Sequence, residues 1–160
     1  MLDWIESTQL GVWMRESPSL WAVPTILTLH TAGMAVLVGA SWMLDLRLLG
    51  INRNVPLSGY RWVFPVVSIG LLVNLVTGVM LFIKNATTWG TAAPFLVKMG
   101  LVIVSAATLV PIRALVLRAH EQDGEQQSDV SSNARLLAIA SILAWTGAVT
   151  AGRLLAYLVV

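Results

Sequence analysis

At 160 residues, 57% hydrophobic and 11% charged, the chain is too apolar for a soluble domain, in which about 25% of residues are charged. Its mean hydropathy of +0.79 is typical of a membrane protein. The absence of cysteine excludes disulfides, thiolate metal sites, iron–sulfur clusters and covalently attached haem. The net charge of +2 comes with no basic, aromatic-rich segment, so we expect no nucleic-acid partner.

The first 16 residues, MLDWIESTQLGVWMRE, mix apolar and charged side chains. This pattern predicts a short amphipathic helix over 1–16 that lies in the membrane interface. Asp3 and Glu6 stand where a signal peptide carries basic residues, so we expect no cleaved signal. The sequence SPS at 17–19 ends this helix.

Four apolar stretches reach the roughly 20 residues that a spanning helix needs. They predict transmembrane helices over 21–44, 63–83, 94–112 and 136–160. The polar run at 120–134 predicts a loop between the last two. We therefore expect an all-α integral membrane protein, a single domain over 1–160.

Small or weakly polar residues recur at every fourth position on two of these spans. The second span carries Gly70, Asn74 and Gly78, and the fourth carries Ala144, Ala148 and Gly152. Such ladders let helix backbones approach closely in lipid, where no hydrophobic force drives helices together. They predict that the spans pack into a compact four-helix bundle.

Arginines mark two of the three connections between spans. They are Arg47, Arg53 and Arg61 after the first span, and Arg113, Arg118 and Arg135 around the polar loop. Cytoplasmic loops carry an excess of basic residues. We therefore expect a multi-pass protein of the bacterial inner membrane, with both termini in the periplasm and the lipid bilayer as its surroundings.

Three ionisable residues fall inside the predicted spans, where charge is costly and often functional, and a fourth directly follows the first span: His30, Lys98 and Arg153, with Asp45. Asp45 is near the cytoplasmic boundary, two residues before Arg47, and needs only interfacial water or a local ion pair. The other three belong to the outer half, with Lys98 about 6 Å deep, Arg153 about 10 Å and His30 about 13 Å at 1.5 Å per residue.

Those three residues, with Asn74 and Thr77, are candidates for a periplasm-facing polar pocket. Two cations above an imidazole suit an anionic or carbonyl-bearing ligand, such as haem propionates, a quinone head group or a lipid phosphate. The alternative is that Lys98 and Arg153 extend to the lipid phosphates. His30 would then bond only Thr31, Asn74, Thr77 or a carbonyl of a neighbouring helix.

Two metal cofactors are candidates. A b-type haem would take His30 as its axial ligand, but Met80 and Met99 lie about 5 Å or more shallower, which disfavours a sixth ligand. Copper would take His30 and Met34, which are i and i+4 on one helix face and offer imidazole and thioether. The alternative for the methionines is ordinary packing.

The sequence lacks the residues of an acid–base or nucleophilic enzyme, because the outer half of the spans holds no carboxylate and no His/Asp/Ser grouping occurs. We expect a protein that is not an enzyme.

Four segments carry a family resemblance: LHTAGMAVLVGASWMLDLRLLG (29–50), VTGVMLFIKNA (76–86), PFLVKMGLV (94–102) and WTGAVTAGRLLAYL (145–158). Together they resemble an uncharacterised family of small four-helix bacterial inner-membrane proteins, itself loosely similar to the copper-resistance D-type membrane domain. By position, His30, Lys98 and Arg153 match the recurrent polar residues of the family. Many members carry Asn or His late in the third span, where this sequence reads SAATLVPIRAL (105–115).

We expect a non-catalytic protein that acts through the polar pocket, and the resemblance implies that it serves as an accessory or subunit of a copper or redox membrane system. Two other readings stay open. One is a structural or assembly subunit without a ligand, which packs against a protein partner or a second copy in the membrane. The other is a b-type haem electron-transfer protein.

Overall fold

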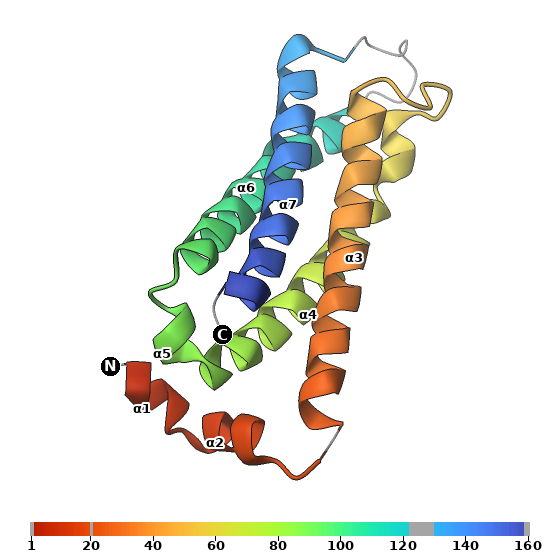
Figure 1. Ribbon diagram of the computed structural model, residues 1–160. Helices are drawn as coiled ribbons and strands as arrows, with labels where there is room; N and C mark the ends of the chain where they lie inside the picture. The colour runs from red at the N-terminus through yellow and green to blue at the C-terminus, as the bar shows by residue number, and fades with distance from the viewer. Residues whose placement is uncertain (1, 20, 122–129, 159–160) are drawn as a thin grey trace.

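The computed structural model describes residues 2–19, 21–121 and 130–158, which contain helices and no strand. The long helices in these ranges are α3 (Ala22–Leu48), α4 (Val63–Lys84), α6 (Ala93–Glu121) and α7 (Ser132–Leu158). Each is long and apolar enough to cross a membrane. Figure 1 shows them side by side in one elongated bundle. The predicted all-α, multi-pass membrane protein with a helical bundle is confirmed.

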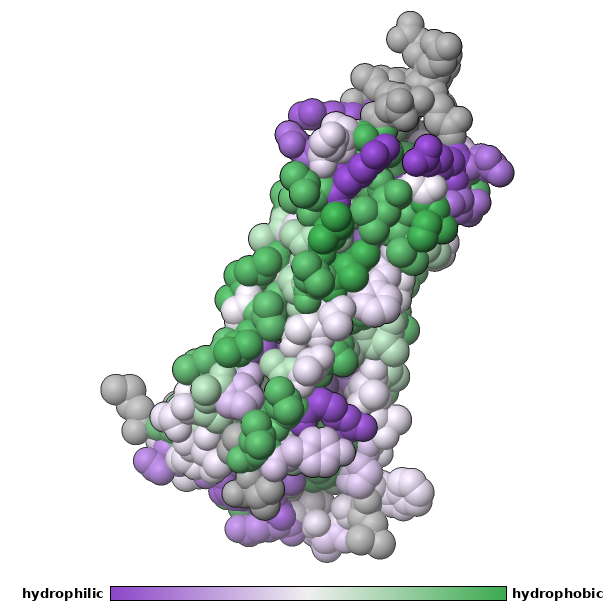
Figure 2. All heavy atoms as spheres, turned by 45° about the horizontal axis from the view of Figure 1, so that its top comes forward, coloured by the Kyte–Doolittle hydropathy of each residue, from purple (hydrophilic) through white to green (hydrophobic). Residues whose placement is uncertain are grey.

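Both ends of the described chain lie at one end of the bundle (Figure 1). We call the end with Ala22, Lys84 and Ala93 the terminal end, and the end with Leu48 and Val63 the loop end. Figure 2 shows hydrophobic side chains over the middle of one face and hydrophilic residues toward its two ends. This distribution is the one that a bilayer requires, because polar groups are costly in its core.

All four long helices extend beyond a predicted bound. α3 continues to Leu48 instead of ending at 44, and α4 continues by one residue to Lys84. α6 continues through Pro111 to Glu121, whereas the sequence predicted a span that ends at 112. α7 begins at Ser132 instead of 136, and the Ser131 hydroxyl accepts a hydrogen bond from the Ala134 N–H at 3.3 Å. Apolar content marks the membrane-spanning part of a helix, not its extension into water. Within the predicted loop over 120–134, residues 122–129 lie outside the described residues, as do 159–160 of the fourth predicted span.

The predicted single helix over 1–16 is wrong, because the structure divides it into α1 (Leu2–Glu6) and α2 (Gln9–Glu16). Thr8 is the reason for the break. Its hydroxyl accepts a hydrogen bond from the Gly11 N–H at 3.2 Å and donates to the Ile5 carbonyl at 2.7 Å. A threonine that caps a new helix in this way ends the preceding one. Both helices lie across the terminal end of the bundle (Figure 1).

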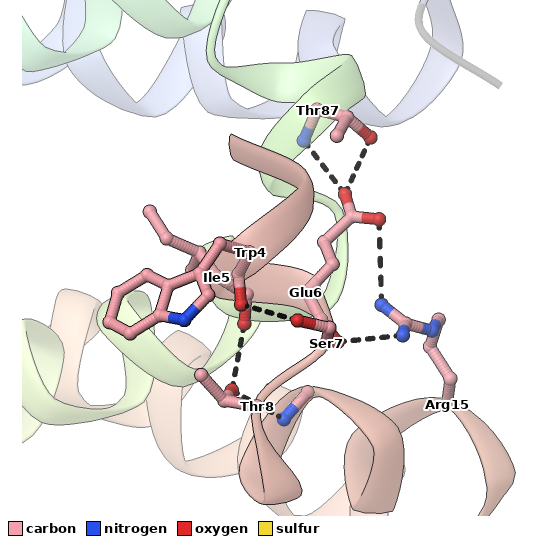
Figure 3. A network of polar contacts seen from close by, with 8 residues as sticks. Trp4, Ile5, Glu6, Ser7, Thr8, Arg15 and Thr87 are labelled. Atoms are coloured by element: carbon pink, nitrogen blue, oxygen red, sulfur yellow. Dashed lines mark hydrogen bonds and ion pairs between the residues drawn. The ribbon is translucent and has the colours of Figure 1, made fainter. Parts of the chain in front are cut away.

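A clamp centred on Glu6 holds α1 and α2 to the bundle (Figure 3). The Glu6 carboxylate accepts hydrogen bonds from the Thr87 N–H at 2.7 Å and the Thr87 hydroxyl at 2.6 Å, in the short helix α5 (Ala86–Trp89). Arg15 of α2 forms an ion pair with the same carboxylate at 3.5 Å and donates to the Glu6 carbonyl at 2.7 Å. Met14 is buried beside Ile26 of α3 and Leu81 of α4, so apolar packing supports the clamp.

Acidification is expected to release this clamp. The hydrogen bonds from Thr87, first, and the charge of Arg15 hold the pKa of Glu6 below its usual value of 4.5. Because the folded pKa lies below the unfolded one, the contribution to docking is present above about pH 4.5 and is lost as the pH falls through the lower, folded pKa. The chain has no cysteine, so spin labels on Gln9→Cys and Thr91→Cys report the position of α2 relative to the bundle.

We expect one narrow distance distribution at pH 7 and a broad one under acid. Glu6→Gln is expected to give the broad distribution at pH 7, whereas Asp3→Asn, at an exposed position on the same helix, keeps the narrow one. A narrow distribution in Glu6→Gln at pH 7 would show that apolar packing alone docks the segment.

The four long helices form two pairs, α3 with α4 and α6 with α7, which are joined by the contact of α3 with α7. The glycine ladder of α4 faces α3, since a Cβ built on Gly70 would lie 3.0 Å from the Leu37 nitrogen. On α7, Ala144 and Ala148 are buried. The predicted small-residue ladders thus lie at helix contacts, as expected for close packing in lipid.

Candidate functional site

His30 of α3 is half-buried and contacts α4 through both its ring and its backbone. Its Nδ1 lies 2.9 Å from the Thr77 hydroxyl, and its carbonyl accepts a hydrogen bond from the Asn74 side-chain amide at 3.1 Å. Thr77 and Asn74 are both buried. These three residues, which the sequence named among the candidates for a polar pocket, therefore form one group between α3 and α4.

The contacts of Thr77 determine which ring nitrogen of His30 carries the proton. The Thr77 hydroxyl has a single hydrogen, and it donates this hydrogen to the Val73 carbonyl at 2.6 Å. It therefore accepts in the bond with His30, so Nδ1 is the protonated nitrogen. The lone pair of the imidazole is then on Nε2, for which no hydrogen-bond partner is found among the described residues.

Gly78 sets the position of the imidazole ring. A Cβ at this position would lie 3.2 Å from His30 Cε1, closer than most side-chain contacts. The ring therefore lies close against α4 at a position where a larger residue would press on it. The predicted ladder residue Gly78 thus positions the ring of the candidate ligand.

Lys98 of α6 brings a positive charge to the same region. Its side chain lies over Gly152 of α7, where a built Cβ would be 3.4 Å from the Lys98 Nζ. The ammonium is close enough to His30 to act on it electrostatically. Among the described residues Lys98 forms no ion pair. His30 and Lys98 thus belong to separate helix pairs and interact at longer range, without a hydrogen bond between them in the described part of the chain.

Arg153 follows Gly152 on α7 and has an exposed side chain. Successive residues point about 100° apart around a helix, so Arg153 does not share the face that Gly152 turns to Lys98. No hydrogen bond or ion pair joins it to His30 or Lys98 within the described part of the chain. Its exposure agrees with the alternative of a side chain that extends to the lipid head groups.

Met34, the candidate copper ligand one turn after His30, packs against the hydrophobic core of the bundle. That core includes Leu37, Val63 and Trp145. Met80 packs with Met14, Ile26 and Leu81 at the terminal end. No group of three or more His, Cys, Asp or Glu side chains suited to a metal ion occurs among the described residues. The packing interpretation of these methionines is the one that agrees with their surroundings.

Taken together, the site offers a fixed imidazole lone pair and a nearby ammonium in the half of the bundle toward the terminal end. An Nδ1–H that donates to a neighbouring group fixes the ring, an arrangement typical of histidines that bind metal through Nε2. An ammonium beside it attracts an anionic group.

Asp45 is the polar residue whose surroundings differ most from expectation. Interfacial water or an ion pair with Arg47 was expected, but the Asp45 side chain is 0% exposed. Arg47 turns away instead and donates to the Val55 carbonyl at 2.8 Å. The expectation is therefore wrong, because the loop carbonyls after α3 attract the guanidinium and α7 covers the carboxyl.

Comparisons of the chain with known protein families, with characterised proteins and with solved structures find no match. The four apolar helices define the class of the protein, a multi-pass helical membrane protein.

Proposed function

We propose that this chain is a non-catalytic protein of the bacterial inner membrane that binds a ligand through His30 and Lys98, and that it serves as an accessory or subunit of a redox or metal system. The observation that carries the proposal is the unpartnered Nε2 of a histidine whose Nδ1 is already bound by Thr77. Intramembrane ionisable groups are costly to bury, so a fixed, half-buried imidazole in a span indicates a functional site.

Of the two metal cofactors considered, b-type haem uses both groups of the site. Its iron takes an imidazole nitrogen and supplies one-electron chemistry when bound, and its propionates are anions that suit the Lys98 ammonium. The chain's own contribution is to orient His30 through Thr77 and Gly78. Copper fits these residues less well, because Met34 packs into the apolar core and a second cation beside Lys98 is repelled.

The proposal also gives the site an orientation in the membrane and assigns supporting roles to Asn74 and Arg153. With both termini in the periplasm, the site belongs to the outer half of the inner membrane. Asn74 fixes the backbone of His30 from α4, and the exposed Arg153 reaches lipid phosphates or an acidic partner protein.

The test is a visible spectrum with metal analysis of the detergent-purified protein, before and after titration with haem. We expect a Soret band that is lost in His30→Ala and retained in Thr31→Ala. Thr31 is the matched control, because its exposed side chain is on the same helix and bonds only the Leu27 carbonyl. Thr77→Val removes the acceptor of the Nδ1–H and is expected to weaken haem binding by roughly 10- to 100-fold. Thr77→Ser keeps the hydroxyl and is expected to bind haem as the wild type does.

Two results would contradict the haem assignment. Stoichiometric copper that is lost in both His30→Ala and Met34→Leu would make copper the ligand. A protein that is colourless and metal-free, and that takes up no haem, would favour the structural interpretation, in which the bonds of His30 to Thr77 and Asn74 serve only to join α3 to α4.

A further inference from the structure

The loop-end half of the bundle contains a second polar site, which the proposed function does not use. It lies where α3 meets α7, the contact that joins the two helix pairs. Asp45 of α3 and Ser141 and Trp145 of α7 are all fully buried there. Both carboxyl oxygens, the Ser141 hydroxyl and the Trp145 indole nitrogen have no hydrogen-bond partner among the described residues.

Ser141 differs from the other buried hydroxyls of the described chain. Ser41, Ser105, Thr108 and Thr77 each donate to a carbonyl of their own helix, at 2.6 to 2.8 Å. Such bonds are the usual way to satisfy a hydroxyl in an apolar surrounding. The Ser141 hydroxyl makes no such bond and lies close to the Asp45 carboxyl. It is therefore available to the carboxyl.

Among the described residues, no cation forms an ion pair with this carboxyl. Arg47, on the same helix, donates to the carbonyls of Val55 and Arg53. On α7, Arg135 is about 9 Å from Ser141 along the helix and Arg153 about 18 Å away in the other direction. α4, the other helix packed on α3, carries only Lys84, at the terminal end. On α6, which packs on α7, Lys98 is toward the terminal end, the Arg113 guanidinium lies over the Phe64 ring at 6.0 Å from its centroid, and Arg118 lies further toward the loop end. An ionised carboxylate would thus be an unpaired charge in an apolar interior, which is strongly disfavoured.

We propose that Asp45 is an intramembrane proton-binding site at the junction of the two helix pairs, with Ser141 as its hydrogen-bond partner. The proton comes from water at the loop end, and the neutral carboxyl donates its O–H to the Ser141 oxygen. Trp145 is one turn from Ser141 on the same face of α7. Its buried N–H has no partner among the described residues, so it is available as a donor to the second carboxyl oxygen.

The donor set favours a proton over a metal cation. Hard cations take about six to eight oxygen ligands, whereas one carboxyl and one hydroxyl supply three. The indole N–H is a donor and cannot ligate a cation. Ionisation of Asp45 would place a charge at the junction of α3 with α7, so proton release is expected to loosen the contact between the pairs.

The experiment measures the infrared absorption of protonated carboxyl groups in the full-length protein in lipid nanodiscs at pH 7. We expect a carboxylic-acid band in the wild type that is lost in Asp45→Asn. Asp3→Asn is the matched control, because it makes the same change at an exposed residue, and it is expected to keep the band. Ser141→Ala is expected to keep the band but shift its frequency, because the hydrogen-bond acceptor is removed.

The Ser141→Ala shift also tests the assignment if Asp45→Asn does not fold. A wild-type protein with no carboxylic-acid band at pH 7 would overturn the proposal, since Asp45 would then be ionised. A band that disappears when sodium chloride replaces choline chloride at equal ionic strength would also overturn it, in favour of a cation site. Both readouts are independent of haem, so they remain valid whatever the outcome at His30.

Discussion

Gly70→Leu is expected to separate α3 from α4 and to lower the free energy of unfolding by about 1 to 3 kcal/mol or more. A Cβ at this position would lie 3.0 Å from the nitrogen and 3.1 Å from the Cα of Leu37. These are backbone atoms of α3, which cannot rotate away as the end of a side chain can. The whole helix has to move, and the contacts along the pair weaken with it.

Unfolding by SDS, followed by circular dichroism in mixed micelles, measures this loss. Gly70→Ala is expected to give an intermediate loss, because it adds only the Cβ. Gly100→Leu is the control, since Gly100 lies in the membrane helix α6 with no atom within 4 Å of a built Cβ. We expect Gly100→Leu to be neutral or slightly stabilising, because leucine favours a helix over glycine by about 1 kcal/mol. Equal losses in the two variants would refute the close α3–α4 contact.

The glycine contacts show which parts of the fold the sequence can predict. The recurrence of small or weakly polar residues at every fourth position, Gly70, Asn74 and Gly78, predicted a packed helix face. That face does contact α3. Spacing alone gives the face of one helix and does not give the partner or the register. The pairing of α3 with α4, and of α6 with α7, therefore had to come from three-dimensional packing.

The sequence predicted only part of the candidate site, because residue spacing and helix length do not give the rotation of each helix. Helix length placed His30 and Lys98 in the same outer half of the membrane, and in the structure they lie within range of an electrostatic interaction. Depth says nothing about rotation, so Arg153 was grouped with them although its side chain is exposed. Thr77 was predicted as a partner of His30, but the tautomer that frees Nε2 depends on its bond to Val73.

Asp45 was misjudged because its sequence neighbour Arg47 suggested an ion pair. The residue that indicates a buried polar contact lies on another helix, α7. Ser141 lies on the small-residue face of α7, between the buried residues Ala138 and Trp145. A serine on a packed face, together with an acid near the end of the span that packs on it, is a pattern that would have indicated a buried polar pair.

The two proposed sites lie in different parts of the bundle. His30 and its partners connect α3 to α4 toward the terminal end, whereas Asp45 and Ser141 lie between α3 and α7 toward the loop end. α3 carries a residue of each group, so a shift of α3 that follows ionisation of Asp45 would also move His30. The proposed proton site and the proposed ligand site are thereby mechanically connected through a single helix.

Trp145→Ala is expected to produce the largest loss of stability among the apolar substitutions, about 3 to 5 kcal/mol. Trp145 is the largest of the fully buried side chains and packs in the core with Leu37, Val63 and Ile112. In lipid the packing of side chains, rather than exclusion of water, holds helices together. Removal of the indole therefore leaves a cavity at the junction of the two helix pairs, which α3 and α7 cannot close without moving.

The same SDS titration measures this effect, with Trp62→Ala as the control. Trp62 precedes α4 and is 57% exposed, so its removal is expected to change the free energy of unfolding by less than about 0.5 kcal/mol. Trp145→Phe keeps most of the apolar volume and removes the N–H, so it is expected to lose much less than Trp145→Ala. A Trp145→Ala protein as stable as Trp62→Ala would mean that the two pairs are held together without this core, and the α3–α7 junction would have to be revised.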